Sequence, residues 1–363
     1  MKSYLSRLLL LSLLGVCPGC NSAGPNEEAA NLRVVSWNVQ NLFDVEWQGT
    51  EYGEYDPRPG EDGRAAWTEQ GFRYRLVHLA KVIDRLDSDI LVLIEVESRE
   101  ALSKLNLQLR RPFLHSLLLP QPDQAINIGL LSRVAVRRSL RHEVGFLPRS
   151  TRQLRAIIEV HLENGLVLFL NHWKSQRQGF LRTLPQRQQA AAVLAERLAR
   201  LEEKYVLVMG DFNEPADSYF RYSDSSFWPD SSGSVDSLIN PWFAYAQLTF
   251  PPGVSEAPIL TRQDWEEMKE EVVPGRLPTS RGSYYFRGEW QAIDSIFFSP
   301  AFLPEPGAGE NAGGWRFAGF SVPRFTPLLG PKGEPNAWRK ERMRGLSDHL
   351  PLVLELEYSP ARD

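Results

Sequence analysis

Cysteine is nearly absent from this sequence of 363 residues. The chain has two cysteines, Cys17 and Cys20, and both lie within its first 20 residues. The rest of the chain therefore has no disulfide framework and depends on a hydrophobic core for its stability. Its composition is sufficient for such a core, because 42% of the residues are hydrophobic and 11% are aromatic. A chain that is disordered throughout is excluded.

An excess of positive charge is also absent. The formal net charge is −4, and it becomes −6 without the first 19 residues, which hold Lys2 and Arg7. Proteins that bind nucleic acid commonly present a broad basic surface, and this composition provides no such field over the whole chain. An anionic substrate must therefore meet a local group of cations or a metal ion.

The N-terminal apolar run is too short to span a bilayer. Lys2 and Arg7 come first, followed by an apolar run over 8–16 and then by small residues. This order is typical of an export signal. We predict an export signal at 1–20 and a small, polar tether at 21–31.

The end of this signal resembles that of bacterial lipoproteins, with Gly19 before Cys20 and Asn21 after it. The resemblance implies that Cys20 carries a lipid and anchors the protein to a membrane of a bacterial cell envelope. Cleavage without lipidation, which gives a secreted or periplasmic protein, is the alternative. A redox pair formed by Cys17 and Cys20 is a further alternative, although the βαβ context of such pairs is missing.

The rest of the chain alternates strand-like and helix-like segments. Apolar and β-branched residues predict strands at 32–37, 89–96, 126–132, 154–162, 165–172, 205–210, 293–299 and 350–358. Apolar residues at intervals of three and four predict a helix over 72–86. A second helix is predicted over 185–204, where a proline near the start precedes alanines and leucines.

Long loops interrupt this pattern at 44–66, 214–283 and 301–345, where Pro, Gly and Ser are frequent. Long loops in a compact domain commonly form the rim of a binding site. No repeat recurs at a fixed period. We therefore predict one mixed α/β domain over 32–358.

Polar residues suited to acid–base or metal chemistry follow or begin the predicted strands. The stretch VLVMGDFNEP shows the pattern, because an apolar strand ends in an acid and an amide. The residues in such positions are Asn38, Glu95, His172, Asp211, Asn213, Asp294, Asp348 and His349. Each alone has a structural explanation, since Asn and Asp also start turns. Together, at the ends of rigid strands, they indicate a shared site.

The motifs around these residues are SWNVQNLF, LIEVES, NHWKS, MGDFNE, IDSIFFS and LSDHLP. In this order they resemble the endonuclease/exonuclease/phosphatase superfamily, and in particular its exported bacterial members, over residues 32–358. The resemblance implies a two-layer β-sandwich flanked by helices, a four-layer α/β/β/α arrangement like that of deoxyribonuclease. The alternation of strands and helices alone also permits a doubly wound sheet.

The resemblance implies hydrolysis of phosphate esters with Mg²⁺ or Mn²⁺. Glu95 would be the principal metal ligand, assisted by Asn38 and Asp348. Oxygen donors of this kind suit both ions, which also retain water and substrate oxygens in their coordination shells.

The same resemblance implies roles for the catalytic residues. Asp211 would orient or deprotonate the attacking water, and Asn213 would hold a phosphate oxygen. His349, oriented by Asp294, and His172 would donate to the phosphate or to the leaving group. A carboxylate behind an imidazole fixes its tautomer and favours its charged form.

Cations for the substrate are harder to assign from sequence. Lys174 and Arg287 are the predicted substrate-binding residues, and Arg152, Arg155 and Arg177 also lie near strand ends. Exposed basic residues are often only solvated, so these positions remain open to that simpler explanation.

Aromatic residues lie next to one of these cations. Tyr284, Tyr285 and Trp290 flank Arg287 and predict either a rim that stacks a base or covers a lipid, or a packed strand with exposed edges. The remaining histidines have no carboxylate in a recognisable motif beside them and are predicted to be structural: His78, His115, His142 and His161.

We predict a metal-dependent phosphodiesterase, namely a nuclease that acts outside the cytoplasm. The alternatives are a phosphodiesterase or phosphatase for phospholipid headgroups or inositol phosphates, and a surface lipoprotein that only binds. An enzyme of the lipid surface needs an exposed apolar element. The loops offer only FWP at 227–229 and PWFAY at 241–245, which favours nucleic acid over lipid.

Overall fold

The structure, a computed structural model, describes residues 30–360 apart from 61–64, 148, 219–237, 249–257, 269–276, 278–281 and 304–312. The predicted export signal, Cys20 and the apolar segment 227–229 lie outside the described residues. The first strand begins at Ala30, so the last two residues of the predicted tether belong to the domain. Within the described part of the chain, no helix is long and apolar enough to cross a membrane.

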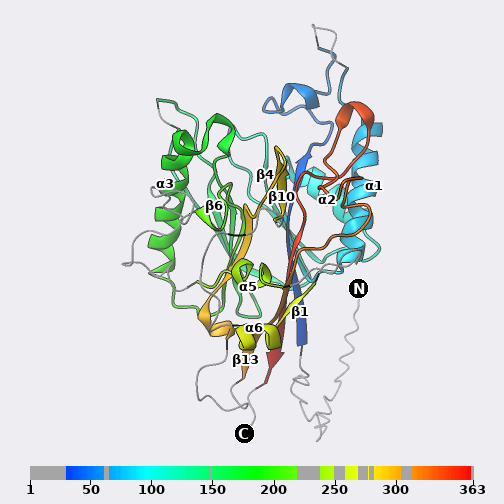
Figure 1. Cartoon of the computed structure of the whole chain (residues 1–363). Helices are drawn as coiled ribbons and strands as arrows, with labels where there is room; N and C mark the ends of the chain where they lie inside the picture. The colour runs from blue at the N-terminus through cyan, green and yellow to red at the C-terminus, as the bar shows by residue number, and fades with distance from the viewer. Residues whose placement is uncertain are drawn as a thin grey trace, which may run out of the picture.

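Two large β-sheets pack face to face between helices (Figure 1). The seven-stranded sheet has the order β3-β4-β2-β1-β14-β13-β9, and the five-stranded sheet has the order β12-β8-β7-β6-β5. The first sheet contains β1 (Ala30–Leu42), β2 (Ile90–Val96), β3 (His115–Leu118), β4 (Asn127–Ser132), β9 (Leu260–Thr261), β13 (Gly314–Ser321) and β14 (Leu352–Ser359). The second contains β5 (Val136–His142), β6 (Ile157–Leu162), β7 (Val167–His172), β8 (Val206–Asp211) and β12 (Asp294–Phe298).

The apolar strand β8 shows why the sheets form layers. Successive side chains of a strand point to opposite faces of its sheet. Leu207 and Met209 accordingly join the core between the two sheets, whereas Val206 and Val208 join a second core. Because both faces are covered, the whole strand is buried and reads as a continuous apolar run. The predicted two-layer sandwich is confirmed, and the doubly wound sheet is excluded.

Helices cover the outer faces of the sandwich. On the side of the seven-stranded sheet lie α1 (Glu69–Leu86) and α2 (Arg99–Leu107), and on the side of the five-stranded sheet lies α3 (Phe180–Leu198) (Figure 1). The side chain of Thr68 caps α1 by accepting a bond from the amide of Gly71 at 3.2 Å. The side chain of Ser98 caps α2 in the same way.

The helix predicted at 185–204 is shifted toward the N-terminus. It begins at Phe180 and ends at Leu198, with Pro185 inside it. Side chains stabilise the first turn, because Thr183 Oγ1 donates to the carbonyl of Gly179 and Arg187 Nη2 donates to the carbonyl of Phe180. These contacts extend the helix ahead of the proline that sequence analysis placed near its start.

The predicted loop at 301–345 contains a strand. In β13 the register with β14 shifts between Phe317 and Gly319, which is a β-bulge. The bulge interrupts the alternation of apolar and polar residues, and this explains why sequence analysis missed the strand. The described connections include the short 3-10 segments η1 (Gly53–Tyr55), η2 (Gln176–Gln178), η4 (Pro300–Phe302) and η5 (Lys340–Arg342).

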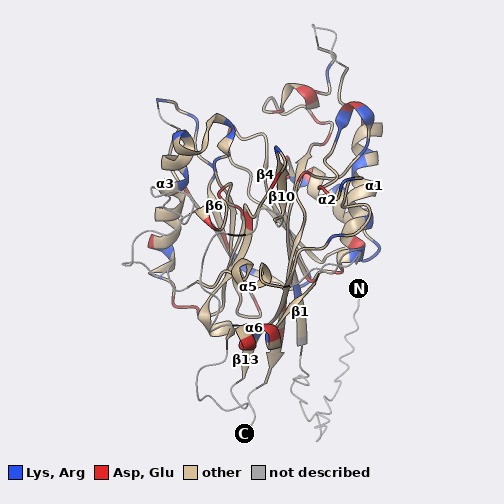
Figure 2. Cartoon of the chain, in the orientation of Figure 1, with Lys and Arg blue, Asp and Glu red and all other residues tan. Residues whose placement is uncertain are grey.

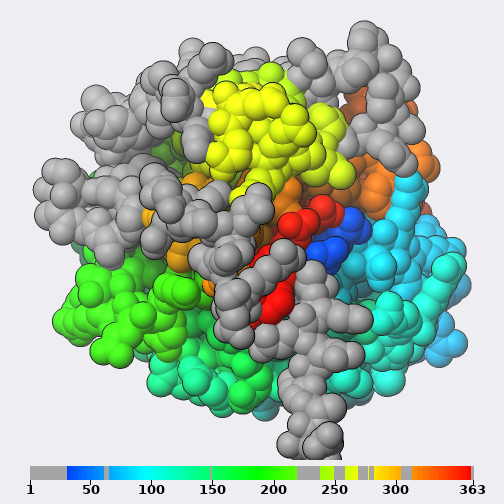
Figure 3. Space-filling view, turned by 90° about the horizontal axis from the view of Figure 1, so that it is seen from below, coloured from blue at the N-terminus to red at the C-terminus, as the bar shows by residue number. Residues whose placement is uncertain are grey.

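The predicted loop at 214–283 also contains regular structure, namely α5 (Trp242–Tyr245), β9 and α6 (Arg262–Met268). Trp242 and Tyr245 are each only 1% exposed. The PWFAY segment is therefore part of the core and is no apolar element for a lipid surface. Figure 3 shows the lower end of the molecule, where α6 (yellow) lies beside the C-terminal strand (red).

Candidate active site

Three predicted site residues lie side by side on the five-stranded sheet. β7 and β8 pair in parallel with His172 opposite Asp211, and β8 and β12 pair antiparallel with Asp211 opposite Asp294. Neighbouring strands are separated by about 4.8 Å, so the three residues form a row. All three are buried. Strand register thus assembles residues that are far apart in sequence.

Glu95 lies on a β-bulge of the other sheet. The pairing of β2 with both of its neighbours shifts register between Ile94 and Val96, and Glu95 has a positive φ of 68°. A β-bulge next to an active site can redirect a side chain toward it. Residues with strained backbone conformations are also frequent at active sites. The Glu95 carboxylate accepts bonds from Asn38 Nδ2 at 3.3 Å and from the amide of Asn41 at 3.0 Å.

Asn38 connects the two sheets. Its Nδ2 also donates to Asp211 Oδ2 at 3.0 Å. Nε2 of His172 lies 3.7 Å from Asp211 Oδ2 and 3.8 Å from Glu95 Oε1. The site is therefore built where the ends of both sheets meet, with β1 and β2 on one side and β7 and β8 on the other.

His349 lies against Asp294. Its Nδ1 is 2.8 Å from Asp294 Oδ2, and because a carboxylate accepts, the ring donates from this nitrogen. The hydroxyl of Ser283 donates to the same oxygen at 2.6 Å. Ser283 belongs to none of the sequence motifs and is not among the predicted site residues. The carbonyl of His349 accepts a bond from Trp37 Nε1 at 3.0 Å, which fixes the backbone.

Asp348 is held by the side chain of Gln40. Oε1 of Gln40 accepts bonds from the amides of Asp348 at 3.0 Å and Trp338 at 2.7 Å. The Asp348 side chain is 35% exposed, and its Oδ1 lies 3.8 Å from His349 Nε2. Gln40 is a second residue that sequence analysis missed, although it lies within the SWNVQNLF motif.

Asn213 occupies the turn that follows β8. Its amide donates to Asp211 Oδ1 at 2.8 Å, its side-chain Nδ2 donates to the carbonyl of Trp173 at 3.2 Å, and its φ is 52°. Gly210 precedes this turn with a φ of 142°, and a Cβ there would lie 1.9 Å from the carbonyl oxygen of Asn171. Only glycine allows this approach of the two strands.

The acidic residues of the site have raised pKa values. Burial and the nearby Asp348 carboxylate raise the pKa of Glu95. Burial and the charge of Asp294 raise the pKa of Asp211 to about 7. Like charges that share a buried site disfavour ionisation. The site therefore gathers negative charge, which a bound cation would stabilise.

The two histidines of the site differ in charge. Burial opposes a charge on His349, but Asp294 outweighs it and raises the pKa of His349 to about 10. Burial and the cations Arg155 and His349 lower the pKa of His172 well below its ordinary value. At neutral pH the site therefore holds one imidazolium and one neutral imidazole.

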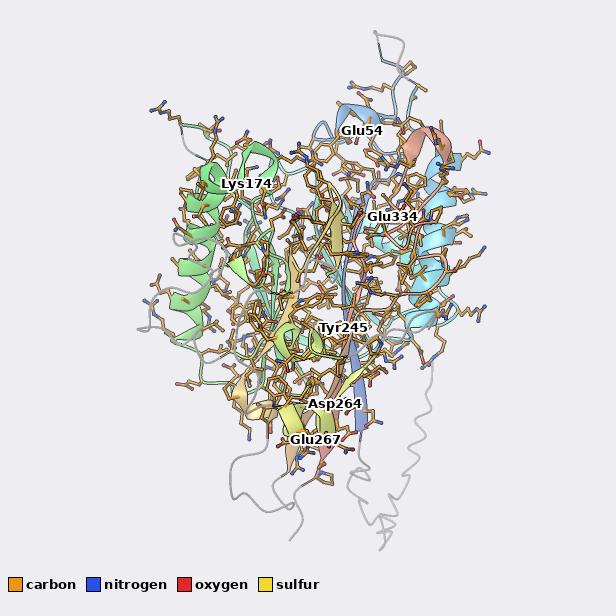
Figure 4. The ribbon with its side chains drawn as sticks, viewed as in Figure 1. Glu54, Lys174, Tyr245, Asp264, Glu267 and Glu334 are labelled. Atoms are coloured by element: carbon orange, nitrogen blue, oxygen red, sulfur yellow. The ribbon has the colours of Figure 1, made fainter. Side chains whose placement is uncertain are left out.

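The site opens into a cleft of about 900 Å³. Of the predicted residues, those that line the cleft are Glu95, His172, Lys174, Asp211, Asn213, Arg287, Asp348 and His349. Asn38 and Asp294 are buried behind this surface. Lys174 and Glu54, which both line the cleft, lie on opposite sides of the upper end of the molecule (Figure 4).

Basic residues form part of the cleft wall. Arg152, Arg155, Lys174 and Arg177 all line it. Burial and the charge of Arg155 lower the pKa of Lys174, and the other arginines add to this effect. Figure 2 shows Lys and Arg near this upper end of α3 and around η5, whereas α6 at the lower end carries acidic residues. The local group of cations that a net-acidic chain needs is present at the cleft.

Comparison with known families decides the classification. Residues 33–231, more than half of the chain, match the Endonuclease/Exonuclease/phosphatase family. The chain belongs to this family. No curated protein matches the sequence.

Solved structures show the same fold. An endonuclease/exonuclease/phosphatase family protein from Bacteroides thetaiotaomicron is 15% identical, with a TM-score of 0.52 over 92% of this chain and 99% of that one. TDP2 from D. rerio, solved with a single-strand DNA product, is 13% identical, with a TM-score of 0.50 over 90% of this chain and 99% of that one. At such identities the likeness establishes the fold of this family member.

Among the described residues of this family member, two groups are candidates to hold a metal ion. Asp211, Asp294 and His349 are buried and bring ligand atoms within 4.8 Å of one another. Asp294 Oδ2, however, already accepts bonds from His349 and Ser283. A metal in this group would have to replace the hydrogen bond between the histidine and its carboxylate.

The second group is formed by Asn38, Glu95 and Asp348. Glu95 and Asp348 both line the cleft, and the charge of Asp348 raises the pKa of Glu95. Their carboxylates supply the oxygen donors that Mg²⁺ and Mn²⁺ prefer, whereas Asn38 turns Nδ2 toward Glu95 and its Oδ1 accepts a bond from the amide of Gln40 at 3.0 Å. The two carboxylates fit a divalent cation without loss of the contact between His349 and Asp294.

Two histidines outside the site form a buried cluster with a carboxylate. His142 and His161, which the sequence predicts to be structural, each contact the carboxylate of Glu159 through Nε2. Arg197 donates to the same carboxylate from Nε at 2.7 Å and Nη2 at 2.8 Å. His161 lies on β6 with Glu159, whereas His142 comes from β5 and Arg197 from α3, so the full cluster depends on tertiary packing. None of these four residues lines the cleft.

Proposed function

We propose that this chain is a metal-dependent phosphodiesterase that cleaves nucleic acid outside the cytoplasm. The observation that carries the proposal is the pair His349 and Asp294, which lies beside Asp211 at the base of a cleft with a cationic wall. Membership of the endonuclease/exonuclease/phosphatase family supports phosphoester hydrolysis. The single-strand DNA product bound to D. rerio TDP2 supports nucleic acid as the substrate class.

Glu95 and Asp348 would hold Mg²⁺ or Mn²⁺, and Asn38, which the sequence predicts as a third ligand, would orient Glu95 through Nδ2. When bound, the ion would neutralise charge on the phosphoryl oxygens and on the departing oxygen. The raised pKa of Glu95 supports this assignment, because the repulsion between Glu95 and Asp348 is the kind that a divalent cation relieves.

His349 binds the phosphate as a cation. Its Nδ1 is occupied by Asp294, so Nε2 is the nitrogen that donates to a phosphoryl oxygen or to the leaving group. Its raised pKa keeps the ring protonated at neutral pH. Hydrogen bonds from a preorganised cation are strong where charge develops in the transition state.

Asp211 accepts a proton from the attacking water. With a pKa of about 7, it is partly ionised at neutral pH and matched to that pH as a base. Asn38 Nδ2 and the amide of Asn213 each donate to one of its oxygens and orient it. His172 remains neutral and donates to the substrate, and Asn213 holds a phosphate oxygen.

Lys174 and Arg287 bind the flanking phosphates of the substrate. Both line the cleft, one beside the arginines of the wall and the other at the tip of a hairpin. We further propose that Cys20 carries a lipid, so that this cleft works at the surface of a bacterial envelope membrane. The order of basic, apolar and small residues in 1–20 supports export.

The rival function is hydrolysis of phospholipid headgroups or inositol phosphates. The cationic wall supports a small polyanionic substrate as well as nucleic acid. Burial of Trp242 and Tyr245 counts against a lipid surface, because it removes PWFAY as an apolar element that could enter one. A protein that only binds has no need of the paired His349 and Asp294.

A substrate panel tests the proposal. Purified protein would be offered plasmid DNA, RNA, sphingomyelin, inositol phosphates and a generic diester, each with Mg²⁺, with Mn²⁺ and with EDTA. We expect nucleic acid to be cleaved with either metal and to remain intact in EDTA. Hydrolysis of sphingomyelin or inositol phosphates with nucleic acid left intact would establish the rival, and no hydrolysis at all would establish the binding protein.

A further inference from the structure

A short hairpin projects beside the catalytic residues. It consists of β10 (Tyr284–Phe286) and β11 (Glu289–Gln291), joined by Arg287 and Gly288 (Figure 1). Both turn residues have positive φ, 52° and 90°, as the favoured two-residue hairpin turn requires. An isolated bridge between Tyr284 and His349 joins the hairpin to the active site.

The two faces of the hairpin have different aromatic contacts. Tyr284 and Phe286 share one face and line the cleft, with ring centroids 6.2 Å apart and planes 15° apart. Tyr284 in turn lies 4.6 Å from the His349 ring. Tyr285 points to the other face, where it packs edge-on against Trp290 at 5.4 Å. A near-parallel pair of rings thus leads from the cleft to the catalytic histidine.

Phe286 is 48% exposed although it lies in a polar cleft. The Arg287 guanidinium lies 5.1 Å from the centre of its ring, so a cation and an aromatic face are presented together. A single exposed phenylalanine needs no explanation. One that is aligned with a second ring beside the catalytic histidine has the form of a stacking surface.

We propose that Phe286 and Tyr284 form a platform on which an unpaired base next to the scissile phosphate stacks. The inference rests on the proposed nuclease function and narrows its substrate to single strands or frayed ends. In a duplex the faces of a base are covered by its neighbours, so the base must leave the stack before it reaches the platform. The cations of the cleft wall would then contact the adjacent phosphates, which carry no sequence information.

Binding in the absence of catalysis tests the platform directly. The probe is a single-stranded oligonucleotide that contains 2-aminopurine, whose fluorescence falls when the base stacks, added to the protein in EDTA. We expect quenching with wild type, and we expect Phe286→Ala to weaken binding roughly 5- to 100-fold, the range for loss of one stacking contact. Phe286→Trp should restore both quenching and affinity.

Tyr285→Ala is the matched control. It removes an exposed aromatic ring from the same hairpin but from the face that does not line the cleft. We expect its affinity to stay within about twofold of wild type. Equal thermal unfolding of the two alanine variants shows that both keep the fold, and if Phe286→Ala unfolds earlier, Phe286→Leu replaces it, because leucine retains apolar bulk without a flat ring.

The outcomes separate this inference from the function on which it rests. Cleavage of single strands with equal quenching in Phe286→Ala and Tyr285→Ala would overturn the platform and leave the nuclease function intact. Equal rates on single strands and on blunt duplex of the same sequence would also overturn it. Failure of wild type both to bind and to cleave any oligonucleotide would overturn the proposed function together with the platform.

Discussion

His349 donates a hydrogen bond from Nδ1 to Oδ2 of Asp294 at 2.8 Å, between residues 55 positions apart in the sequence. The bond selects the ring nitrogen that faces the substrate, and the Asp294 charge keeps the ring protonated. Ser283 supports the pair by donating to the same carboxylate oxygen. This relationship determines the pH range over which the site should work.

Asp294→Asn should shift the pH profile to lower pH. In wild type the rate should rise as Asp211 ionises at about pH 7 and fall as His349 loses its proton at about pH 10. Removing the Asp294 charge lowers both pKa values, because that charge disfavours ionisation of Asp211 and favours protonation of His349. The measurement is kcat/KM on a diester across this pH range.

The loss of kcat in Asp294→Asn gives a second check. Asp294→Asn should reduce kcat roughly 10²- to 10⁴-fold, as expected for a group that controls an acid–base residue. Ser283→Ala keeps the charge of Asp294 and loses one hydrogen bond, so it should cost about tenfold and leave the profile in place. A pH profile that does not shift in Asp294→Asn would show that the Asp294 charge does not set the pKa values of Asp211 and His349.

Glu95→Gln should abolish metal-dependent activity. The substitution retains the size of the side chain but removes the carboxylate proposed as the main ligand, so Mn²⁺ binding should weaken by more than the roughly 10- to 100-fold lost with outer-shell partners. In EDTA the variant should unfold no earlier than wild type, because a buried like-charge repulsion is removed. Calorimetric Mn²⁺ titration and thermal unfolding with and without Mn²⁺ measure both effects.

Glu97→Gln is the control for this prediction. Burial and Asp44 raise the pKa of Glu97 to about 9, so its carboxyl group is protonated at neutral pH and glutamine resembles it. Activity and Mn²⁺ binding should therefore stay within about threefold of wild type. Loss of activity in Glu97→Gln as large as that in Glu95→Gln would show that any change at this strand end disrupts the fold.

Lys174→Ala and Arg287→Ala should make KM less dependent on salt. Each proposed phosphate contact releases counterions, so each variant should reduce the slope of log affinity against log salt by about 0.7–0.9. Arg110→Ala is the charge-matched control, because its side chain is 89% exposed and lies outside the cleft. KM would be measured at salt concentrations from about 50 to about 300 mM. If all three variants kept the wild-type slope, Lys174 and Arg287 would not be phosphate-binding residues.

Glu159→Gln should destabilise the protein without touching the cleft. The Glu159 side chain is fully buried, and its bonds with two histidines and Arg197 outweigh burial and hold its pKa well below the ordinary value. Breaking such a buried pair costs about 3–5 kcal/mol in the free energy of unfolding. Glu196→Gln, which breaks an exposed pair with Arg200, should change it by less than about 0.5 kcal/mol.

The pH dependence of this stability follows from the lowered pKa. A carboxylate of this kind contributes its full stability above its unfolded pKa of about 4.3 and loses it as the pH falls through its folded pKa. Wild type should therefore lose more stability than Glu159→Gln on acidification below about pH 5. Denaturant unfolding of both proteins at several pH values measures the difference, and parallel curves would contradict it.

Cys20→Ser should release the protein from membranes. If Cys20 carries the lipid, its loss removes the anchor, whereas Cys17→Ser retains it. Fractionation of cells that produce each variant measures the distribution. Membrane association that persists in Cys20→Ser, or that is lost equally in Cys17→Ser, would contradict lipidation at Cys20.

Much of the fold was predictable because its interior strands are apolar and continuous. Strands such as β8 are covered on both faces, and their composition alone marks them. The strand β13 was missed because a bulge disturbs its alternation, and α5 was missed because PWFAY is too short to show a helical period. Local pattern therefore failed where tertiary packing decides the structure.

The candidate site was predictable as a set of residues but not as an arrangement. Their positions at strand ends were visible in the sequence, whereas the register that places Asp211 between His172 and Asp294 was not. Ser283 carries no sequence signal, because its contact with Asp294 depends on the path of a loop. In the cluster around Glu159, His161 lies two residues away on the same strand, but His142 and Arg197 come from another strand and a helix, and no local spacing reveals their contacts.

The most direct test of the account is the rate of phosphodiester hydrolysis by wild type and by Asp211→Asn, each with Mn²⁺ and with EDTA. Asparagine preserves the size of the side chain and removes the base. We predict turnover by wild type only with Mn²⁺ and a loss of roughly 10²- to 10⁴-fold in the variant. Equal turnover by the two proteins, or undiminished wild-type turnover in EDTA, would contradict metal-dependent hydrolysis at this site.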